Sequence, residues 1–171
     1  VSHRHLVQLY ELEVVGSQAF FTMEWIRGRD FFAFACGPDG TCARDADRIR
    51  VAFAQLVEGL AALHTRGILH RDVKPGNVIV DDDGRVVLLD FGLALGMDPT
   101  RVLARQSDGF AGTLAYTAPE QAWGQSITPA ADLYGAGVVL YEALTGRLPF
   151  EGPGLGAMLD RQHRTIRSPV D

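Results

Sequence analysis

The sequence predicts a domain of the α+β class, with a short β-hairpin placed between two longer helices. Two apolar runs, residues 78–80 and 86–89, flank the turn residues Asp83 and Gly84, a combination typical of a hairpin. Residues 45–65 carry apolar side chains at three- and four-residue steps, which predicts an amphipathic helix closed by Gly67. Residues 128–145 are apolar nearly all round, which predicts a buried helix that starts at Thr128-Pro129.

Length and composition allow one globular domain with a substantial core. The chain has 171 residues, of which 47% are hydrophobic and 22% charged, and its formal net charge is −5. This charge argues against general nucleic-acid binding. No apolar run is long enough for a membrane span, and no signal-peptide pattern occurs. Cys36 and Cys42 have no second cysteine pair or histidine cluster with them, so we expect reduced thiols in a cytosolic protein.

The N-terminal part predicts two strands. Residues 6–10 alternate apolar and polar side chains, as a half-buried strand does, and Gly16-Ser17 forms a turn. Residues 19–26 then form a second, aromatic-rich strand. Residues 31–43, with a Gly-Pro-Asp-Gly turn, predict a short helix or a loop. His64, near the end of the long helix, is expected to have a structural role.

Polar side chains stand at the ends of the two hairpin strands that the fold brings together. Asp72, Lys74 and Asn77 precede the first strand, and Asp90 follows the second. Two carboxylates and an amide at one point form the oxygen-rich type of site that Mg²⁺ prefers. The alternative is that Asp72 and Asp90 are loop carboxylates that cap turns, which is the favoured interpretation for either residue alone.

Three ordered motifs carry a resemblance to a known family. They are His70-Arg71-Asp72-x-Lys74-x-x-Asn77, Asp90-Phe91-Gly92 and Ala118-Pro119-Glu120. They resemble the catalytic loop, the magnesium-binding triplet and the end of the activation segment of eukaryotic-like (Hanks-type) protein kinases. Lys74 is typical of the Ser/Thr-directed branch, and the stretches around Gly76 and Asp132 look most like bacterial members. The resemblance implies a protein-kinase-like fold: a mainly helical large lobe with a two-strand remnant of the small lobe.

The resemblance also implies catalytic roles. Asp72 would orient the attacking hydroxyl and accept its proton, and Lys74 would offset charge on the transferred phosphoryl group. Asn77 and Asp90 would hold Mg²⁺, with Mn²⁺ as an alternative. His70, Phe91 and Asp132 would be structural, and Asp132 would anchor the backbone of the catalytic loop.

ATP is the cofactor that the resemblance implies. Met23 would be the gatekeeper, the backbone of Glu24 and Ile26 in the hinge would bind the adenine edge, and Asp30 would meet the ribose. Ile79 would pack against the adenine from below. For Met23 and the neighbouring Trp25, simple core packing is the favoured alternative on sequence alone.

The resemblance places regulatory and docking residues in the segment that ends at Glu120. Arg71 would pair with a phosphate on Thr100 or Ser107. The equally weighted alternative is that both hydroxyls are ordinary exposed loop residues. Thr113 would form a hydrogen bond near Asp72 and Lys74.

The domain organisation follows from the same alignment. Residues 1–26 would be the last small-lobe strands and the hinge, and residues 27–171 the large lobe, truncated at its C-terminal end. The chain contains no Gly-rich loop or Val-Ala-Ile-Lys strand, so we expect an internal piece of a larger kinase domain that is inactive alone.

The resemblance implies transfer of the ATP γ-phosphate to protein Ser or Thr hydroxyls in the cytoplasm. The expected partners are ATP and Ser/Thr-containing proteins, without nucleic acid or a membrane segment in this piece. Dimerisation of the parent kinase, or its anchoring to a membrane outside this piece, is a further option. Two alternatives stay open: a non-catalytic binding module that docks partners through residues 113–120, and a small-molecule phosphotransferase of kinase-like fold.

Overall fold

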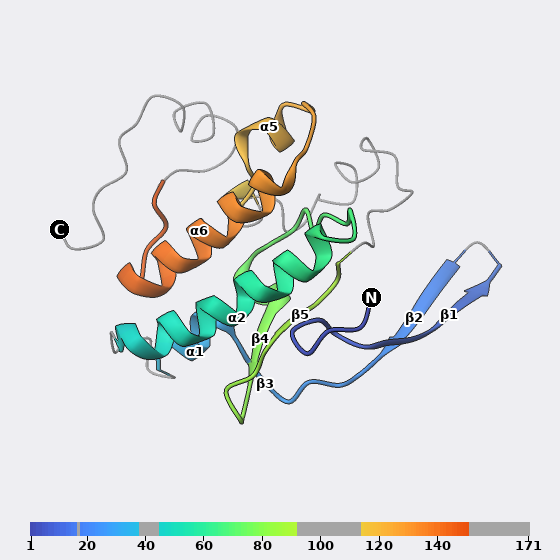
Figure 1. Ribbon diagram of the computed structural model, residues 1–171, viewed down its shortest axis with the longest axis horizontal. Helices are drawn as coiled ribbons and strands as arrows, with labels where there is room; N and C mark the ends of the chain where they lie inside the picture. The colour runs from blue at the N-terminus through green and yellow to red at the C-terminus, as the bar shows by residue number, and fades with distance from the viewer. Residues whose placement is uncertain (17, 38–44, 92–113, 151–171) are drawn as a thin grey trace.

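Two long helices lie side by side, one of them packed against a small sheet, and a separate β-hairpin extends from this core (Figure 1). The computed structural model describes residues 1–16, 18–37, 45–91 and 114–150. Its elements in chain order are β1 (Leu9–Val15), β2 (Gln18–Met23), β3 (Gly28–Asp30), α1 (Phe31–Ala35), α2 (Ala46–His64), the 3₁₀-helix η1 (Pro75–Asn77), β4 (Val78–Asp81), β5 (Val86–Leu88), α5 (Pro119–Ala122) and α6 (Pro129–Thr145).

The two long helices begin where their capping residues predict. Asp45 caps α2 and accepts a hydrogen bond from the N–H of Arg48 at 3.0 Å. Thr128 caps α6 ahead of Pro129, and Gly146 ends the helix in the left-handed conformation, with φ of 72°. Both helix predictions are therefore confirmed to within one residue at each end.

The predicted hairpin is confirmed, with a third strand added to it. Strands β4 and β5 pair antiparallel, with Val78 opposite Leu88. The strand β3, which the sequence analysis did not predict, pairs with the other edge of β4 and sets Asp30 opposite Ile79. Gly28 permits this approach, because a Cβ atom there would lie 2.3 Å from the carbonyl oxygen of Val80.

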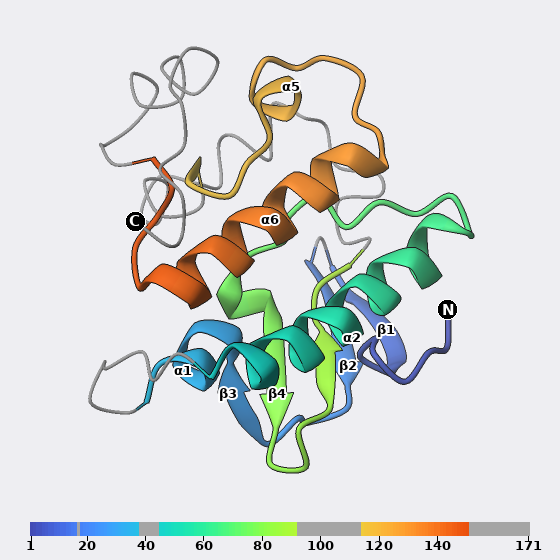
Figure 2. The same ribbon diagram turned by 60° about the vertical axis from the view of Figure 1, so that its left-hand side comes forward.

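The N-terminal residues extend the same sheet on its other side. The N–H of Val7 donates to the carbonyl of Leu88 at 2.9 Å, and the N–H of Leu88 donates to the carbonyl of His5 at 2.9 Å. Leu6 and Val7 are buried in the core, which the sheet shares with α2 and α6. Figure 2 shows α2 crossing this sheet and α6 lying beside α2.

The β1–β2 hairpin differs from the sequence-based expectation. Its first strand runs from Leu9 to Val15 rather than over residues 6–10, and every residue of β1 is exposed. The expected half-buried strand is therefore wrong, because among the described residues β1 and β2 pair only with each other. Trp25, 90% exposed, and Met23, also exposed, are not packed in the core, so that alternative is wrong for both residues.

Two further observations concern the cysteines and the membrane. Cys36 is buried and disulfide-bonded, so the expectation of reduced thiols is wrong for this residue. Its bonding partner is not among the described residues. No helix in the described ranges has the length and the apolar character that a membrane span requires.

Candidate active site

The loop between α2 and β4 is held by a buried carboxylate of α6. Asp132, only 1% exposed, accepts hydrogen bonds from the backbone N–H of His70 at 2.9 Å and of Arg71 at 2.7 Å. The Nε2 atom of His64 lies 2.7 Å from the same carboxylate. These are the contacts that the resemblance implies for Asp132, and they explain how a carboxylate remains in the core. They also give His64 the structural contact that its position predicts.

His70 links this loop to the chain that leads into Asp90. Its Nδ1 lies 3.3 Å from the N–H of Asp72, and its Nε2 lies 2.8 Å from the carbonyl oxygen of Leu89. These partners assign the proton of the neutral ring to Nε2, which donates to Leu89. Burial lowers the pKa of His70, against the opposing effect of the Asp132 charge. A neutral imidazole therefore ties the two segments together.

Two polar side chains of the loop converge on one carboxylate oxygen of Asp72. The Nζ of Lys74 lies 2.7 Å from Oδ2 of Asp72, and the side-chain nitrogen of Asn77 donates to the same oxygen at 2.9 Å. Asn77 also donates to the backbone carbonyl of Asp72 at 2.8 Å. Among the described residues no hydrogen bond reaches the other oxygen of Asp72. The carboxylate is therefore oriented, with one oxygen left to accept a proton from a bound group.

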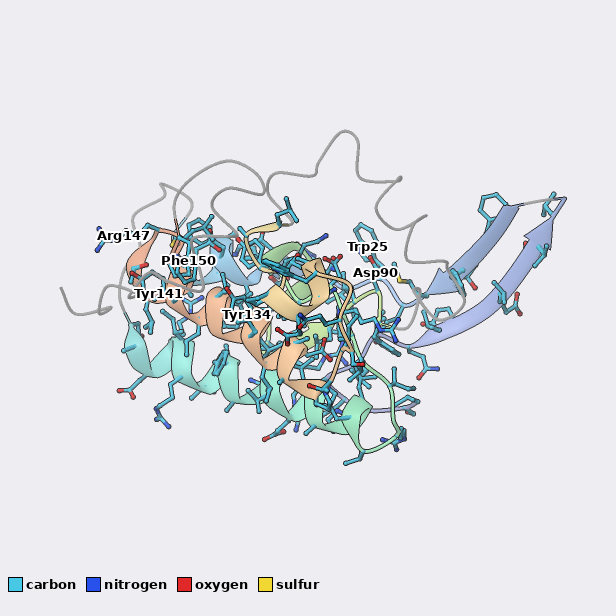
Figure 3. The ribbon with its side chains drawn as sticks, turned by 90° about the horizontal axis from the view of Figure 1, so that it is seen from above. Trp25, Asp90, Tyr134, Tyr141, Arg147 and Phe150 are labelled. Atoms are coloured by element: carbon cyan, nitrogen blue, oxygen red, sulfur yellow. The ribbon has the colours of Figure 1, made fainter. Side chains whose placement is uncertain are left out.

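The hairpin register brings Asn77 and Asp90 to the same end of the sheet. The N–H of Leu89 donates to the carbonyl of Asn77 at 2.9 Å, so Asp90 follows one residue later. Asp90 is exposed and has φ of 57°, a left-handed conformation rare for residues other than glycine. Figure 3 shows Asp90 on the side of the core that faces the β1–β2 hairpin. That Asn77 and Asp90 would bind one cation together stays a prediction.

The donor set fits a magnesium ion by its chemistry. Asn77 uses its amide nitrogen toward Asp72, which leaves its amide oxygen without a hydrogen bond among the described residues. That oxygen and the exposed carboxylate of Asp90 are ligands of the type that Mg²⁺ accepts along with water and phosphate. In the described part of the chain, no group of three or more His, Cys, Asp or Glu side chains is arranged to hold a metal ion. Phosphate oxygens would thus be needed to complete the shell.

The residues predicted to bind nucleotide lie on β2, on β3 and β4, and on the segment between β2 and β3. Met23 and Asp90 line a cavity of about 180 Å³ together with Phe91 and residues of β1 and β2. Asp30 lies opposite Ile79 in the sheet and caps α1, where its side chain accepts from Ala33 at 2.8 Å. Ile26 packs against the core from the segment between β2 and β3.

The segment before α5 is joined to α6, and α5 itself is joined to the loop between α2 and β4. The hydroxyl of Tyr116 donates to the carboxylate of Glu142 at 2.5 Å, and Gln121 donates to the carbonyl of Arg71. Burial raises the pKa of Glu142, which the hydrogen bond from Tyr116 partly offsets. Burial also raises the pKa of Tyr116, and its contact with Glu142 adds to this increase. The sequence analysis missed this pair, because nothing local marks residues 26 positions apart as partners.

The remaining predicted residues have less structural description. Phe91 is buried. Glu120 lies in the first turn of α5. Among the described residues, only the backbone carbonyl of Glu120 forms a hydrogen bond. Thr100, Ser107 and Thr113 lie outside the described residues.

Comparisons with known proteins connect this geometry to a family. The family model described as "Protein kinase domain" matches residues 1–168. The chain is 32% identical, over 99% of its length, to the probable serine/threonine-protein kinase PknB of Bifidobacterium longum, and covers 25% of that protein. It is 37% identical over its full length to the serine/threonine-protein kinase pkn2 of Myxococcus xanthus and covers 21% of it. It is also 40% identical, over 96% of its length, to the putative CBL-interacting protein kinase 13 of rice, of which it covers 31%. The chain thus spans less than a third of the length of these curated relatives.

Proposed function

The chain belongs to the protein kinase domain family, and from this premise we propose that the protein containing it is a Ser/Thr protein kinase. The proposed reaction is transfer of the γ-phosphate of ATP to Ser or Thr hydroxyls of protein substrates. The observation that carries the proposal is the orientation of the Asp72 carboxylate by Lys74 and Asn77. ATP as the donor implies that the reaction occurs in the cytoplasm.

The proposed chemistry assigns one task to each side chain of the loop. The carboxylate of Asp72 accepts the proton of the attacking hydroxyl and holds that hydroxyl in line with the phosphate. The ammonium of Lys74, already at this carboxylate, stabilises negative charge on the phosphoryl group in transit. Asn77 and Asp90 would hold Mg²⁺, which neutralises charge on the phosphates when bound.

The proposed nucleotide site uses the segment that connects β2 to β3. Among the described residues, the carbonyl of Glu24 and the N–H of Ile26 form no hydrogen bond, which supports their proposed use by the adenine edge. Asp30, at the start of α1, is proposed to meet the ribose, and its partner in the sheet, Ile79, to support the adenine.

The test is a pair of conservative variants in the full-length protein. Asp72→Asn is expected to bind ADP with nearly unchanged affinity but to lose at least about 10²-fold in kcat, because the proton acceptor is removed. Asp90→Asn is expected to lose both turnover and the magnesium-dependent part of nucleotide binding, because a metal ligand is removed. Isothermal titration with ADP and a phosphotransfer assay measure both quantities.

The control is Asp83→Asn, an exposed carboxylate in the turn of the same hairpin, which is expected to behave as wild type. Equal loss of nucleotide binding in the Asp72 and Asp90 variants would contradict the two separate roles. Assays on protein and on aminoglycoside substrates distinguish a protein kinase from a small-molecule phosphotransferase of the same fold.

A regulatory role is proposed for Arg71. Its side chain is exposed, and among the described residues its guanidinium forms no ion pair or hydrogen bond, which leaves it available for a phosphate on Thr100 or Ser107. The Thr100→Ala, Ser107→Ala double variant is expected to lose most activity, with the phosphate located in wild type by mass spectrometry. Full activity in that double variant would assign Arg71 another role.

A further inference from the structure

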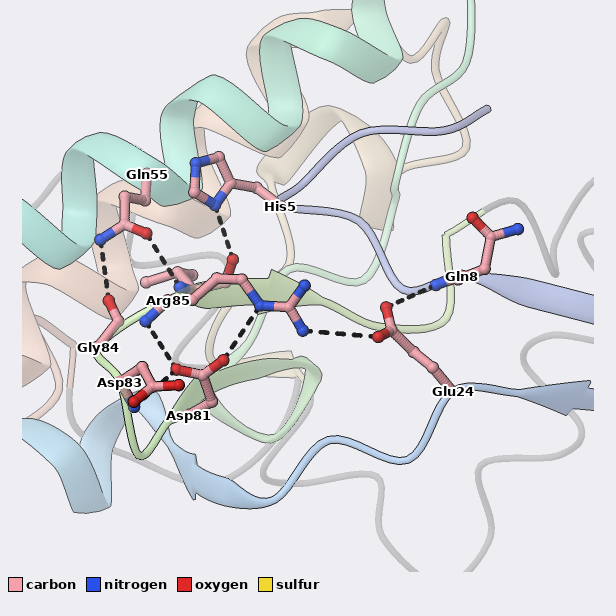
Figure 4. A network of polar contacts seen from close by, with 9 residues as sticks. His5, Gln8, Glu24, Gln55, Asp81, Asp83, Gly84 and Arg85 are labelled. Atoms are coloured by element: carbon pink, nitrogen blue, oxygen red, sulfur yellow. Dashed lines mark hydrogen bonds and ion pairs between the residues drawn. The ribbon is translucent and has the colours of Figure 1, made fainter.

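A network of polar contacts joins the segment after β2 to the turn between β4 and β5 (Figure 4). Its central member is Arg85, whose guanidinium lies between two carboxylates. The Nε atom lies 3.1 Å from Asp81, and Nη2 lies 3.5 Å from Glu24. The fork of the guanidinium suits this double contact, because its N–H groups point in fixed directions.

The turn end of this network is rigid. One oxygen of Asp81 accepts hydrogen bonds from the backbone N–H of Asp83 at 3.0 Å and of Arg85 at 2.8 Å. The other oxygen of Asp81 is the one that meets the guanidinium. Because Asp81 thus binds both the backbone and the side chain of Arg85, the orientation of that side chain is determined within the turn.

Helix α2 anchors the turn between β4 and β5. The side chain of Gln55 donates to the carbonyl of Gly84 at 3.0 Å and accepts from the N–H of Val86 at 3.1 Å. Buried His5 adds a contact between its Nδ1 and the carbonyl of Val86 at 2.8 Å. The position of Arg85 is therefore fixed relative to the helix that carries the catalytic loop at its end.

The other end of the network holds the proposed adenine-binding segment. Glu24 accepts the N–H of Gln8 at 2.9 Å with its second carboxylate oxygen, and its own N–H donates to the carbonyl of Gln8 at 2.9 Å. These contacts employ the side chain and the N–H of Glu24, whereas its carbonyl forms no hydrogen bond within the described ranges and can accept one from a ligand. The direction of that carbonyl thus depends on where Arg85 holds the carboxylate.

Partial burial makes this ion pair stronger than a surface pair. Glu24 and Arg85 are each largely covered, whereas the nearby pair of Arg27 and Asp82, at 3.4 Å, lies in the solvent, with the Arg27 side chain 90% exposed. Exposed pairs contribute little because water and salt screen them, and screening weakens with burial. The two pairs lie at the same turn and so allow a matched comparison.

We propose that Arg85 is a positioning residue for the nucleotide, which orients the adenine-binding backbone through Glu24 without touching the ligand. This inference rests on the proposed kinase function. The protein holds the segment after β2 in register with the catalytic loop through one guanidinium fixed to the β4–β5 turn. Loss of this contact lowers nucleotide affinity and leaves the chemical step intact.

The test uses Arg85→Gln, Glu24→Gln and the double variant in the full-length protein. Each single variant is expected to raise the Kd for ADP and the KM for ATP about three- to tenfold, with kcat within about twofold of wild type. Glu24→Gln retains an oxygen for the N–H of Gln8 and so isolates the ion pair. The double variant is expected to be no weaker than either single variant, because both remove the same contact.

Arg27→Gln is the matched control and is expected to keep the wild-type Kd. Unchanged Kd in both Arg85→Gln and Glu24→Gln, additive losses in the double variant, or a fall in kcat at constant KM would each overturn the inference. If Arg85→Gln fails to fold, Glu24→Gln alone tests the inference: a raised KM with nearly unchanged kcat supports it, and an unchanged KM overturns it. Failure of wild type to bind ADP would instead refute the proposed function.

Discussion

Asp132 fixes the geometry of the loop between α2 and β4 by binding its backbone. Arg71 has φ of 68°, a left-handed conformation that costs about 1–2 kcal/mol in a residue with a Cβ atom. The carboxylate of Asp132 accepts the N–H of this residue at 2.7 Å, which offsets that cost. A strained backbone held by a buried charge directly before Asp72 is typical of a functional site, where the surrounding structure imposes the conformation.

The buried imidazole next to this strain predicts a pH dependence of stability. Burial lowers the pKa of His70 in the folded protein, while the unfolded chain binds the proton near the ordinary value of about 6.5. Just below pH 6.5 the unfolded state therefore carries more protons, and the free energy of unfolding decreases as the pH falls. Above this range His70 is neutral in both the folded and the unfolded state, so it no longer makes the free energy of unfolding depend on pH.

The measurement is urea unfolding of wild type and His70→Gln between pH 5 and pH 8. The neutral glutamine can still donate to the carbonyl of Leu89, so the variant is expected to lose less stability than wild type as the pH falls from 7 to 5. The other titratable groups are common to both proteins, so the comparison uses only the difference in stability between wild type and the variant. An equal slope in both would show that His70 does not contribute.

Helix α6 passes close to the loop between α2 and β4. On the face of α6 that contains Gly135, this closeness restricts the size of the side chain. A Cβ atom at Gly135 would lie 3.0 Å from the carbonyl oxygen and 3.1 Å from the Cβ of Val73, and 3.3 Å from the carbonyl oxygen of Tyr116. A Cβ atom at Gly137, two residues later, would meet nothing within 4 Å. The same helix therefore contains a glycine that packing requires and one that packing does not.

Alanine substitutions separate these two cases. Alanine is the better helix former by about 1 kcal/mol, so Gly137→Ala is expected to raise the free energy of unfolding by up to that amount. Gly135→Ala is expected to lower it by about 1–3 kcal/mol, because the new methyl group forces the backbone of Val73 to move. Thermal unfolding of both variants measures this. A stabilising Gly135→Ala would contradict the close packing.

In the molecule as a whole, the β1–β2 hairpin is the least supported part. Among the described residues neither strand has a second neighbour. Its exposed apolar side chains are Leu9, Tyr10, Leu12, Val14, Val15, Phe20, Phe21 and Met23. A two-stranded hairpin is marginally stable in water, and apolar side chains on both faces, along with unpaired strand edges, favour association.

The isolated 171-residue chain is therefore expected to associate and to lack kinase activity. The printed sequence contains no Gly-rich phosphate loop, and the loss of one preorganised electrostatic group costs about 10²–10³ in rate. Light scattering and transfer of radiolabelled phosphate from ATP check both points. A monomeric chain with transfer activity that Asp72→Ala abolishes would contradict this prediction.

The sequence by itself determined the helices, the hairpin and the return of the chain after β5 to the start of β4. Helix bounds follow from capping residues such as Asp45 and Thr128, which act within a few positions along the chain. A hairpin with a short turn necessarily returns the chain to its start, so the residues before β4 and after β5 meet. For these features the determining contacts are local, and a local pattern can therefore reveal them.

Only the tertiary structure decided the contacts between distant segments. The pairing of β3 with β4, the addition of His5 to Val7 beside β5, and the contact of Glu24 with Arg85 join residues 49 or more positions apart. Three residues such as Gly28–Asp30 carry no periodicity, and a single arginine or glutamate does not indicate its partner. These contacts depend on how the helices and the sheet pack, because a partner of the right chemistry must also be brought within a few ångströms.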